Sequence, residues 1–261
     1  MALEFAIAIL FLAVASYYDV FNKRTIPDWL SYSFIIVALL STVLTAGVDF
    51  IKIGVAIAVF AIGYLIYRVG YIGGADVFFI TGLVLLLPIT ENSNGVGIPV
   101  IVNVLLISTL TMAVYLEFSF FAQKRKVEPR MQEIITAIVW IVGYLAIAYL
   151  LSSLGLVLLA GLAVVVGAIS SVFALIKRDL AKSLIIEVAP KDIIEEDILA
   201  VEEMDPKVVE RLKLERLLTK EQIKRIKDAG LESVPIYGKL PPYMPFLLVG
   251  VVAALVLSLM P

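Results

Sequence analysis

Two aspartates stand where apolar segments of the sequence end or begin, and their side chains could do chemistry together. Asp19 follows the apolar run 2–18, and Asp76 opens the apolar run 76–90. An acidic side chain in or at the end of a membrane span is costly and is by default a candidate for function. Two carboxylates that share a site repel each other, so one keeps its proton while the other stays ionised. Such a pair can supply the general acid and the general base of a hydrolysis.

Small residues come directly before Asp76, namely Gly73, Gly74 and Ala75. Residues without bulky side chains allow the backbone to turn sharply or a substrate strand to approach. The sequence does not separate these two roles, and both make this segment a candidate for shaping the site.

A charged connection follows Asp19 and ends in Pro27 and Asp28. Pro27 is expected to fix the start of the next helix, because its ring sets the backbone angle. Asp28 could attract a basic segment of a substrate. An acid beside an apolar run is also typical of a helix end in the headgroup region, and this alternative applies to Asp19 and Asp76 when each is taken alone.

The composition excludes several kinds of catalysis. The 261-residue chain has no cysteine and no histidine, which removes thiolate nucleophiles, the Ser-His and Cys-His dyads and the usual zinc ligands. Hydrolytic chemistry must therefore rest on Asp, Glu, Lys or Tyr, and we expect neither a metal nor a cofactor. The net charge of -2 and the shortness of the basic run 124–126 argue against a nucleic-acid partner.

The chain is 61% hydrophobic and has a mean hydropathy of +1.02, which predicts a protein solvated by lipid. About 20 apolar residues cross the hydrocarbon core as a helix, and we expect an all-α polytopic membrane protein with eight spans. A count of six or seven stays open, because the fourth candidate is short and the sixth and seventh are nearly continuous. The candidate spans are 2–18, 29–47, 51–69, 76–90, 98–121, 134–153, 155–176 and 243–260.

Basic residues alternate along the connections between these spans. The first connection holds Lys23 and Arg24, the third begins at Arg68, and the fifth and seventh (122–133 and 177–241) hold most of the others. The even connections are nearly bare of positive charge. Because basic connections stay in the cytoplasm, the pattern predicts a multi-pass protein of the cell membrane with its N-terminus outside. Both aspartates then lie at the cytoplasmic edge of the bilayer.

The segment 177–241 is the stretch long enough for a soluble domain. We therefore expect a transmembrane core over 1–176, a small cytoplasmic α+β insert over 177–241 and a final transmembrane helix over 242–261.

Within the insert, Asp205 followed by Pro206 predicts the start of one helix, and a capping box that opens at Thr219 predicts the start of another. Residues 183–189 and 234–237 are candidates for short strands.

The segment 19–28, Asp-Val-Phe-Asn-Lys-Arg-Thr-Ile-Pro-Asp, resembles the Asp-x-x-x-x-x-Ile-Pro-Asn/Asp segment of type IV prepilin peptidases. Gly73-Gly74-Ala75-Asp76 resembles their second motif, Gly-x-Gly-Asp, in its relaxed form with a hydrophobic third residue. The two motifs lie about 57 residues apart, a spacing consistent with two intervening spans. The similarity is best over residues 1–90.

This resemblance implies an aspartic endopeptidase with Asp19 and Asp76 as its catalytic residues. It implies partners that are precursor proteins, each with a short, positively charged leader before a hydrophobic helix, cut between the two at the cytoplasmic face. The insert and the closing run 239–246 resemble the C-terminal extension of archaeal members, which process prepilins and the preproteins of the archaeal swimming filament. Bacterial relatives carry an additional N-terminal segment with paired cysteines that is linked to N-methylation. This chain begins at the span with Asp19, so methyltransferase activity is not implied.

Two other classes of function stay open. A transporter or channel could use Asp19 and Asp76 as a proton or cation relay, and Glu117 inside the fifth span favours it. Against it, both aspartates lie at one interface and no inverted repeat is visible. A scaffold that works through 177–241 would leave both aspartate motifs unexplained. Loss of activity on changing either aspartate to asparagine separates the peptidase from the scaffold, and proton-coupled uptake in liposomes would identify the transporter.

Overall fold

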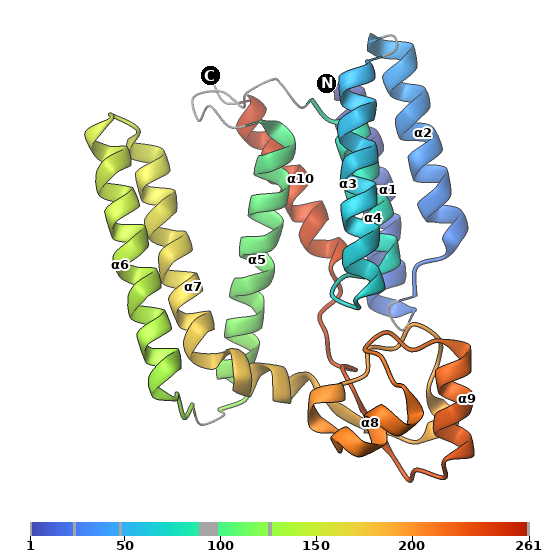
Figure 1. The fold of residues 1–261 in the computed structure, drawn as a ribbon. Helices are drawn as coiled ribbons and strands as arrows, with labels where there is room; N and C mark the ends of the chain where they lie inside the picture. Colours follow the sequence, from blue (N-terminus) through green and yellow to red (C-terminus); the bar gives the residue numbers. More distant parts are fainter. Residues whose placement is uncertain (1, 23–24, 47–48, 89–98, 125–126, 260–261) are drawn as a thin grey trace.

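The computed structural model describes residues 2–22, 25–46, 49–88, 99–124 and 127–259, and it is mainly helical (Figure 1). The predicted all-α polytopic membrane fold is confirmed. The apolar helices are α1 (Ala2–Phe21), α2 (Asp28–Ala46), α3 (Phe50–Arg68), α4 (Gly74–Leu86), α5 (Val100–Ala122), α6 (Met131–Ser153), α7 (Val157–Leu184) and α10 (Met244–Leu259). Each of the eight candidate spans falls on one of them. By length and composition, α1, α3, α5, α6 and α7 can cross a membrane, and the total of eight crossings stays a prediction.

The fourth helix, α4, starts earlier and ends sooner than the predicted span 76–90. It begins at Gly74, so Asp76 is the third residue of the helix and not the first. It ends at Leu86 because Leu87 is extended, with φ -86° and ψ 153°. Leu87 precedes Pro88, and the proline ring disfavours a helical backbone in the residue before it. The result is a helix of 13 residues in which the side chains 81–86 are all buried.

Close contacts with α2 and α3 hold α4 inside the bundle. A Cβ atom on Gly82 would lie 2.5 Å from the ring of Phe34, and one on Gly63 would lie 2.9 Å from Val77. The glycines therefore let α2 and α3 approach α4 more closely than any other residue would allow, as small residues do in membrane bundles. The helix that carries Asp76 is fixed on two sides.

The seventh helix, α7, is longer than the predicted span 155–176. It continues through the charged stretch 177–182 to Leu184. Its last turns pack on α5 through Ile176 and Leu180, which cluster with Phe120. Figure 1 shows this end of α7 running past α5 to the insert.

The main hydrophobic core is shared by α1, α2, α3, α4, α5 and α10. The C-terminal helix α10 packs between α1 and α5, although the insert separates it from them along the chain. The pair α6 and α7 forms a hairpin whose contacts with the bundle run through α5. The last helix in the sequence is therefore central in space.

The insert is a small α+β unit, as predicted. Strands β1 (Ile186–Val188) and β2 (Val234–Ile236) pair antiparallel, with Val188 opposite Val234. Helix α8 (Pro206–Leu212) is capped by the Asp205 carboxylate, which accepts from the Lys207 N–H at 2.9 Å. Helix α9 (Lys220–Asp228) is capped by the Thr219 hydroxyl. These elements enclose a second hydrophobic cluster that includes Leu199, Leu218, Ile226 and Val234.

The insert lies at the end of the bundle where α1 and α7 finish and where α4 and α10 begin (Figure 1). Arg68 ends α3 and Lys124 follows α5 at this same end. Other basic residues used in the topology argument, Lys23, Arg24, Arg125 and Lys126, lie outside the described residues.

Candidate active site

Asp19 lies in the last turn of α1 and is buried, with 6% of its surface exposed. Its Oδ2 atom accepts a hydrogen bond from the backbone N–H of Met244 at 2.9 Å. Met244 is the first residue of α10. A carboxylate near the end of an apolar helix is thus held by the start of a helix that comes 225 residues later.

Asp76 is the third residue of α4 and folds back over the start of its own helix. Its Oδ2 atom accepts from the backbone N–H of Gly73 at 3.1 Å. Gly73 is extended, with φ -71° and ψ 148°, and directly precedes the helix. An acid at this position satisfies one of the N–H groups that has no partner inside the helix and complements the positive end of the helix dipole.

The two carboxylates lie close enough for their charges to interact. They reach the same level because α1 ends and α4 begins at one end of the bundle, and the two helices contact each other. Neighbouring carboxylates that interact in this way titrate as a pair, so one proton shared between them is favoured over two ionised groups. That is the state in which one group can give a proton while the other takes one.

The small residues before Asp76 pack at close range. A Cβ atom on Gly73 would lie 2.9 Å from the Oδ2 atom of Asp76, so any side chain there would displace the carboxylate. A Cβ atom on Gly74 would lie 3.4 Å from the ring of Tyr67, which is ordinary contact. Ala75 is partly buried against the main core. An added Cβ atom is therefore more crowded at Gly73, where the Asp76 carboxylate must move, than at Gly74.

Pro27 and Asp28 lie at the start of α2. The carbonyl of Pro27 accepts from the Leu30 N–H at 2.9 Å, which closes the first turn of the helix. Asp28 is exposed as the first residue of α2. Among the described residues no hydrogen bond joins Asp28 to either aspartate of the pair.

The sequence did not single out Tyr243, the residue directly before α10. Its side chain is partly buried against the main core, is hydrogen-bonded to Thr109 of α5 and interacts electrostatically with Asp76. The signal that could have drawn attention to it is its place in the proline-rich run 239–246, directly before an apolar helix.

The insert also contacts the connection that leads from α3 to Asp76. The hydroxyl of Tyr67 donates to Oε1 of Glu196 at 2.7 Å. The guanidinium of Arg216 lies over the ring of Tyr71, with its carbon 4.7 Å from the ring centre. Gly70 has a left-handed backbone (φ +79°), and a Cβ atom there would lie 3.3 Å from Arg216. These contacts join distant parts of the chain, so no local sequence pattern predicts them.

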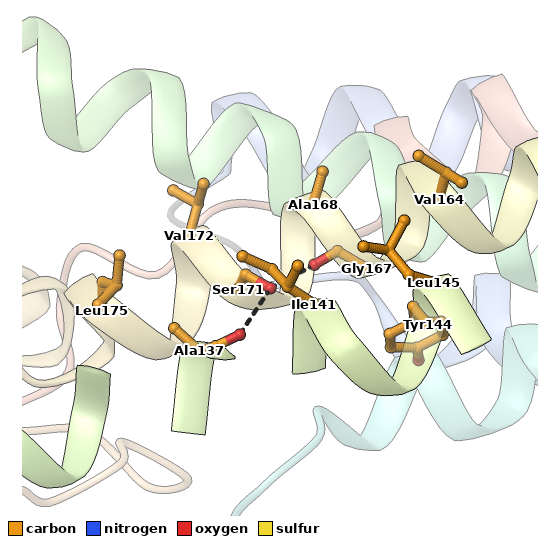
Figure 2. Close-up of a pocket in the computed structure, with 10 residues that line it drawn as sticks. All are labelled: Ala137, Ile141, Tyr144, Leu145, Val164, Gly167, Ala168, Ser171, Val172 and Leu175. Atoms are coloured by element: carbon orange, nitrogen blue, oxygen red, sulfur yellow. Dashed lines mark hydrogen bonds between the residues drawn. The ribbon is translucent and has the colours of Figure 1, made fainter. Parts of the chain in front are cut away.

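A cavity of about 380 Å³ lies elsewhere, between α6 and α7 (Figure 2). Its walls are apolar apart from the hydroxyls of Tyr144 and Ser171, and Ser171 donates to the carbonyls of Ala137 and Gly167. No charged residue lines it. Since the aspartates come from α1 and α4, this cavity is not part of their site. Within the described ranges no cluster of three or more acidic side chains that could hold a metal ion is found either.

The fold and the site define a multi-pass membrane protein with two interacting carboxylates at the ends of two of its helices. Residues 6–117, which hold both aspartates, match the type IV leader peptidase family. The family is one of peptidases, so the resemblance to prepilin peptidases seen in the two motifs is confirmed at the level of the family. No curated protein and no solved structure matches the chain. Helices α6, α7 and α10 and the insert lie beyond the matched region.

Proposed function

We propose that this protein is an aspartic endopeptidase that removes the short, positively charged leader from type IV prepilin-like or archaellin precursors. The observation that carries the proposal is the interaction of the Asp19 and Asp76 carboxylates inside the region that matches the leader peptidase family. We assign both aspartates as catalytic, and Gly73, Gly74 and Ala75 as the residues that shape the turn before Asp76.

The proposed chemistry needs one ionised and one protonated carboxyl group. The ionised group takes a proton from water, and the resulting hydroxide attacks the carbonyl carbon of the scissile peptide bond. The protonated group gives its proton to the carbonyl oxygen. When the tetrahedral intermediate collapses, the C–N bond breaks and the proton taken from water passes to the leaving amine. One hydroxyl proton of the new carboxyl product returns to the other aspartate, so both groups regain their starting states. The geometry does not favour either aspartate for either role, so the roles are assigned to the pair.

Cleavage of a pilin-like precursor in membranes tests this function. We expect the unchanged protein to cleave it, and Asp19→Asn and Asp76→Asn each to abolish cleavage while expression is retained. Asp49→Asn is the matched control, because Asp49 is also an acid at the end of an apolar helix. It caps α3 by accepting from the N–H groups of Ile51 and Lys52, a role that asparagine fills equally well. Cleavage that survives both substitutions in the pair would rule out the mechanism.

We also propose that the site faces the cytoplasm of the cell and that the N-terminus is outside. The alternation of basic connections supports this orientation, and so does the position of the insert at the same end as both aspartates. Because the chain has no cysteine, the reactivity of a single introduced cysteine shows on which side of the membrane that position lies. Glu232→Cys in the insert should react with an impermeant reagent only after the cells are opened, and Leu154→Cys in the α6–α7 turn should react in intact cells. The reverse result would invert the orientation.

The division into a peptidase core (1–176), an insert (177–241) and a final helix (242–261) belongs to the same proposal.

The substrate is proposed to place its hydrophobic helix against the membrane helices and its basic leader at the cytoplasmic edge, beside Asp28. A precursor whose leader lysines and arginines are replaced by glutamine should be cleaved more slowly, and Asp28→Asn should reduce that difference. The same cleavage rate for both precursors would contradict the proposed role of the leader's positive charge.

A transporter is not proposed, because Asp19 is near the end of α1 and Asp76 is in the first turn of α4. Those two helix ends meet at one end of the bundle and not along a path across it. Glu117, the residue that favoured this class, has a buried oxygen without a hydrogen-bond partner among the described residues. A single acid on α5 does not provide a proton or cation path from the aspartate pair to the other side of the membrane.

A further inference from the structure

The first turn of α10 approaches both members of the aspartate pair. The backbone N–H of Met244 donates to Asp19 at 2.9 Å. The side chain of the preceding residue, Tyr243, interacts electrostatically with Asp76 and is hydrogen-bonded to Thr109. Met244 therefore contacts one of the two carboxylates directly, and it lies outside the matched region 6–117.

Dense packing fixes the position of α10. Met244, Leu247 and Val251 are completely buried on one side of the helix. Gly250 leaves no room for a Cβ atom against Ser108 of α5, so the two helices are in backbone-level contact. Because packed helices do not shift continuously, the N–H of Met244 is a donor held in one place.

The hydrogen-bond pattern at the start of α10 leaves this donor available. The carbonyl of Tyr243 accepts from the N–H groups of Phe246 and Leu247 at 3.0 and 3.2 Å, so the ladder of the helix starts there. The N–H of Met244 precedes that ladder and has no partner inside the helix, as is general for the first turn. The Asp19 carboxylate accepts the hydrogen bond from this N–H group.

The electrostatics of the two helices favour the same contact. Asp19 stands at the C-terminal end of α1, where the helix dipole disfavours a negative charge. The N-terminal end of α10 has the opposite sign and offsets this cost. Asp76 stands at the N-terminal end of α4, so only Asp19 depends on a second helix for a favourable field.

We infer that the first turn of α10 is a positioning element for the aspartate pair, with the Met244 N–H orienting Asp19. The inference rests on the proposed peptidase function and deepens it: the site is complete only when the helix after the insert has docked between α1 and α5. Met244 is a positioning residue, because its N–H acts on the Asp19 carboxylate and not on the substrate.

A substitution to proline tests the Met244 contact directly. Proline is favoured at the first position of a helix and lacks an N–H, so Met244→Pro removes the donor while the helix can still form. Met244→Leu is the matched control, because it keeps the N–H and most of the buried volume.

The first measurement is thermal unfolding of the full-length protein in detergent, for both Met244 variants with and without Asp19→Ala. If the N–H holds Asp19, Asp19→Ala lowers the Tm by about 2–4 °C more in the Met244→Leu background than in the Met244→Pro background. Equal losses in the two backgrounds would overturn the inference. This result does not depend on finding a substrate, so it stays separate from the test of the peptidase itself.

The second measurement is the rate and pH profile of precursor cleavage. We expect Met244→Pro to cleave about tenfold more slowly than Met244→Leu, with a displaced pH profile, while the profile of Met244→Leu overlies that of the unchanged protein. A merely structural loss would lower the amount of active protein without moving the profile. If Met244→Pro and Met244→Leu share one rate and one profile while Asp19→Asn is inactive, the peptidase stands and the positioning role fails.

Discussion

The backbone N–H of Gly73 donates to the Asp76 carboxylate at 3.1 Å, and a Cβ atom on Gly73 would lie 2.9 Å from the same oxygen. The backbone angles of Gly73 are φ -71° and ψ 148°, which any residue can adopt. A side chain at this position is therefore opposed by the space that the carboxylate occupies and not by the conformation of the chain.

Gly73→Ala is expected to slow precursor cleavage roughly ten- to a hundredfold, because the new methyl group pushes the Asp76 carboxylate out of place. Gly54→Ala is the control, since a Cβ atom there would meet nothing within 4 Å. Both rates are measured per molecule of folded protein. If Gly73→Ala is as active as Gly54→Ala, the close approach seen at Gly73 does not matter for the reaction.

Gly82→Ala is expected to destabilise the protein by about 1–3 kcal/mol, the usual cost of overpacking a core. The ring of Phe34 would lie 2.5 Å from the added methyl group, and it cannot retreat because it is completely buried and stacked on Phe79 at 4.9 Å. The Tm in detergent measures the effect. Adding Phe34→Leu to Gly82→Ala should restore part of the lost stability, and Gly143→Ala, where the methyl group meets nothing within 4 Å, should leave it unchanged.

Arg216→Ala is expected to loosen the connection between α3 and α4 that leads to Asp76. The guanidinium lies between the rings of Tyr71 and Tyr237, at 4.7 and 5.1 Å from their centres, and such contacts are worth about 0.5–2 kcal/mol. Hydrogen exchange of the backbone amides in 69–73 should become faster, and cleavage should slow. Arg211→Ala, an exposed arginine on α8, is the matched control. Unchanged exchange in Arg216→Ala would mean that the insert does not restrain this connection.

The insert should lose stability at high pH through Tyr237. Burial and the hydrogen bond from its hydroxyl to Glu202 raise the pKa of Tyr237 to about 12, from 10.0 in the absence of these effects. A group whose pKa is higher in the folded state stabilises that state fully below pH 10 and loses this contribution as the pH rises towards 12. The difference between the tyrosinate absorbance titrations of the unchanged protein and Tyr237→Phe isolates this group. A difference curve with its midpoint at pH 10 would contradict the prediction.

Local sequence signals located most of the secondary structure. The apolar runs coincide with helices, the Asp205-Pro206 pair and Thr219 cap α8 and α9, and the two short strands fall inside the expected ranges. The errors are at boundaries. Pro88 shortened α4, and α7 continued eight residues beyond its apolar part because helical charged residues follow it without a break. Boundaries depend on both neighbours and solvent, so apolar periodicity places them less well than it places the elements.

The sequence by itself determined that Asp19 and Asp76 stand at the ends of apolar helices and, through the number of helices between them, that both ends fall at the same level. Only the tertiary structure decided which atoms hold them. The N–H of Met244 reaches Asp19, and Glu196 and Arg216 reach the segment before Asp76. Helix periodicity and capping act between residues a few positions apart, so they can be read along the chain. Contacts between segments far apart in sequence are set by how glycines, rings and methyl groups fill the shared core. This core exists only once the helices have packed.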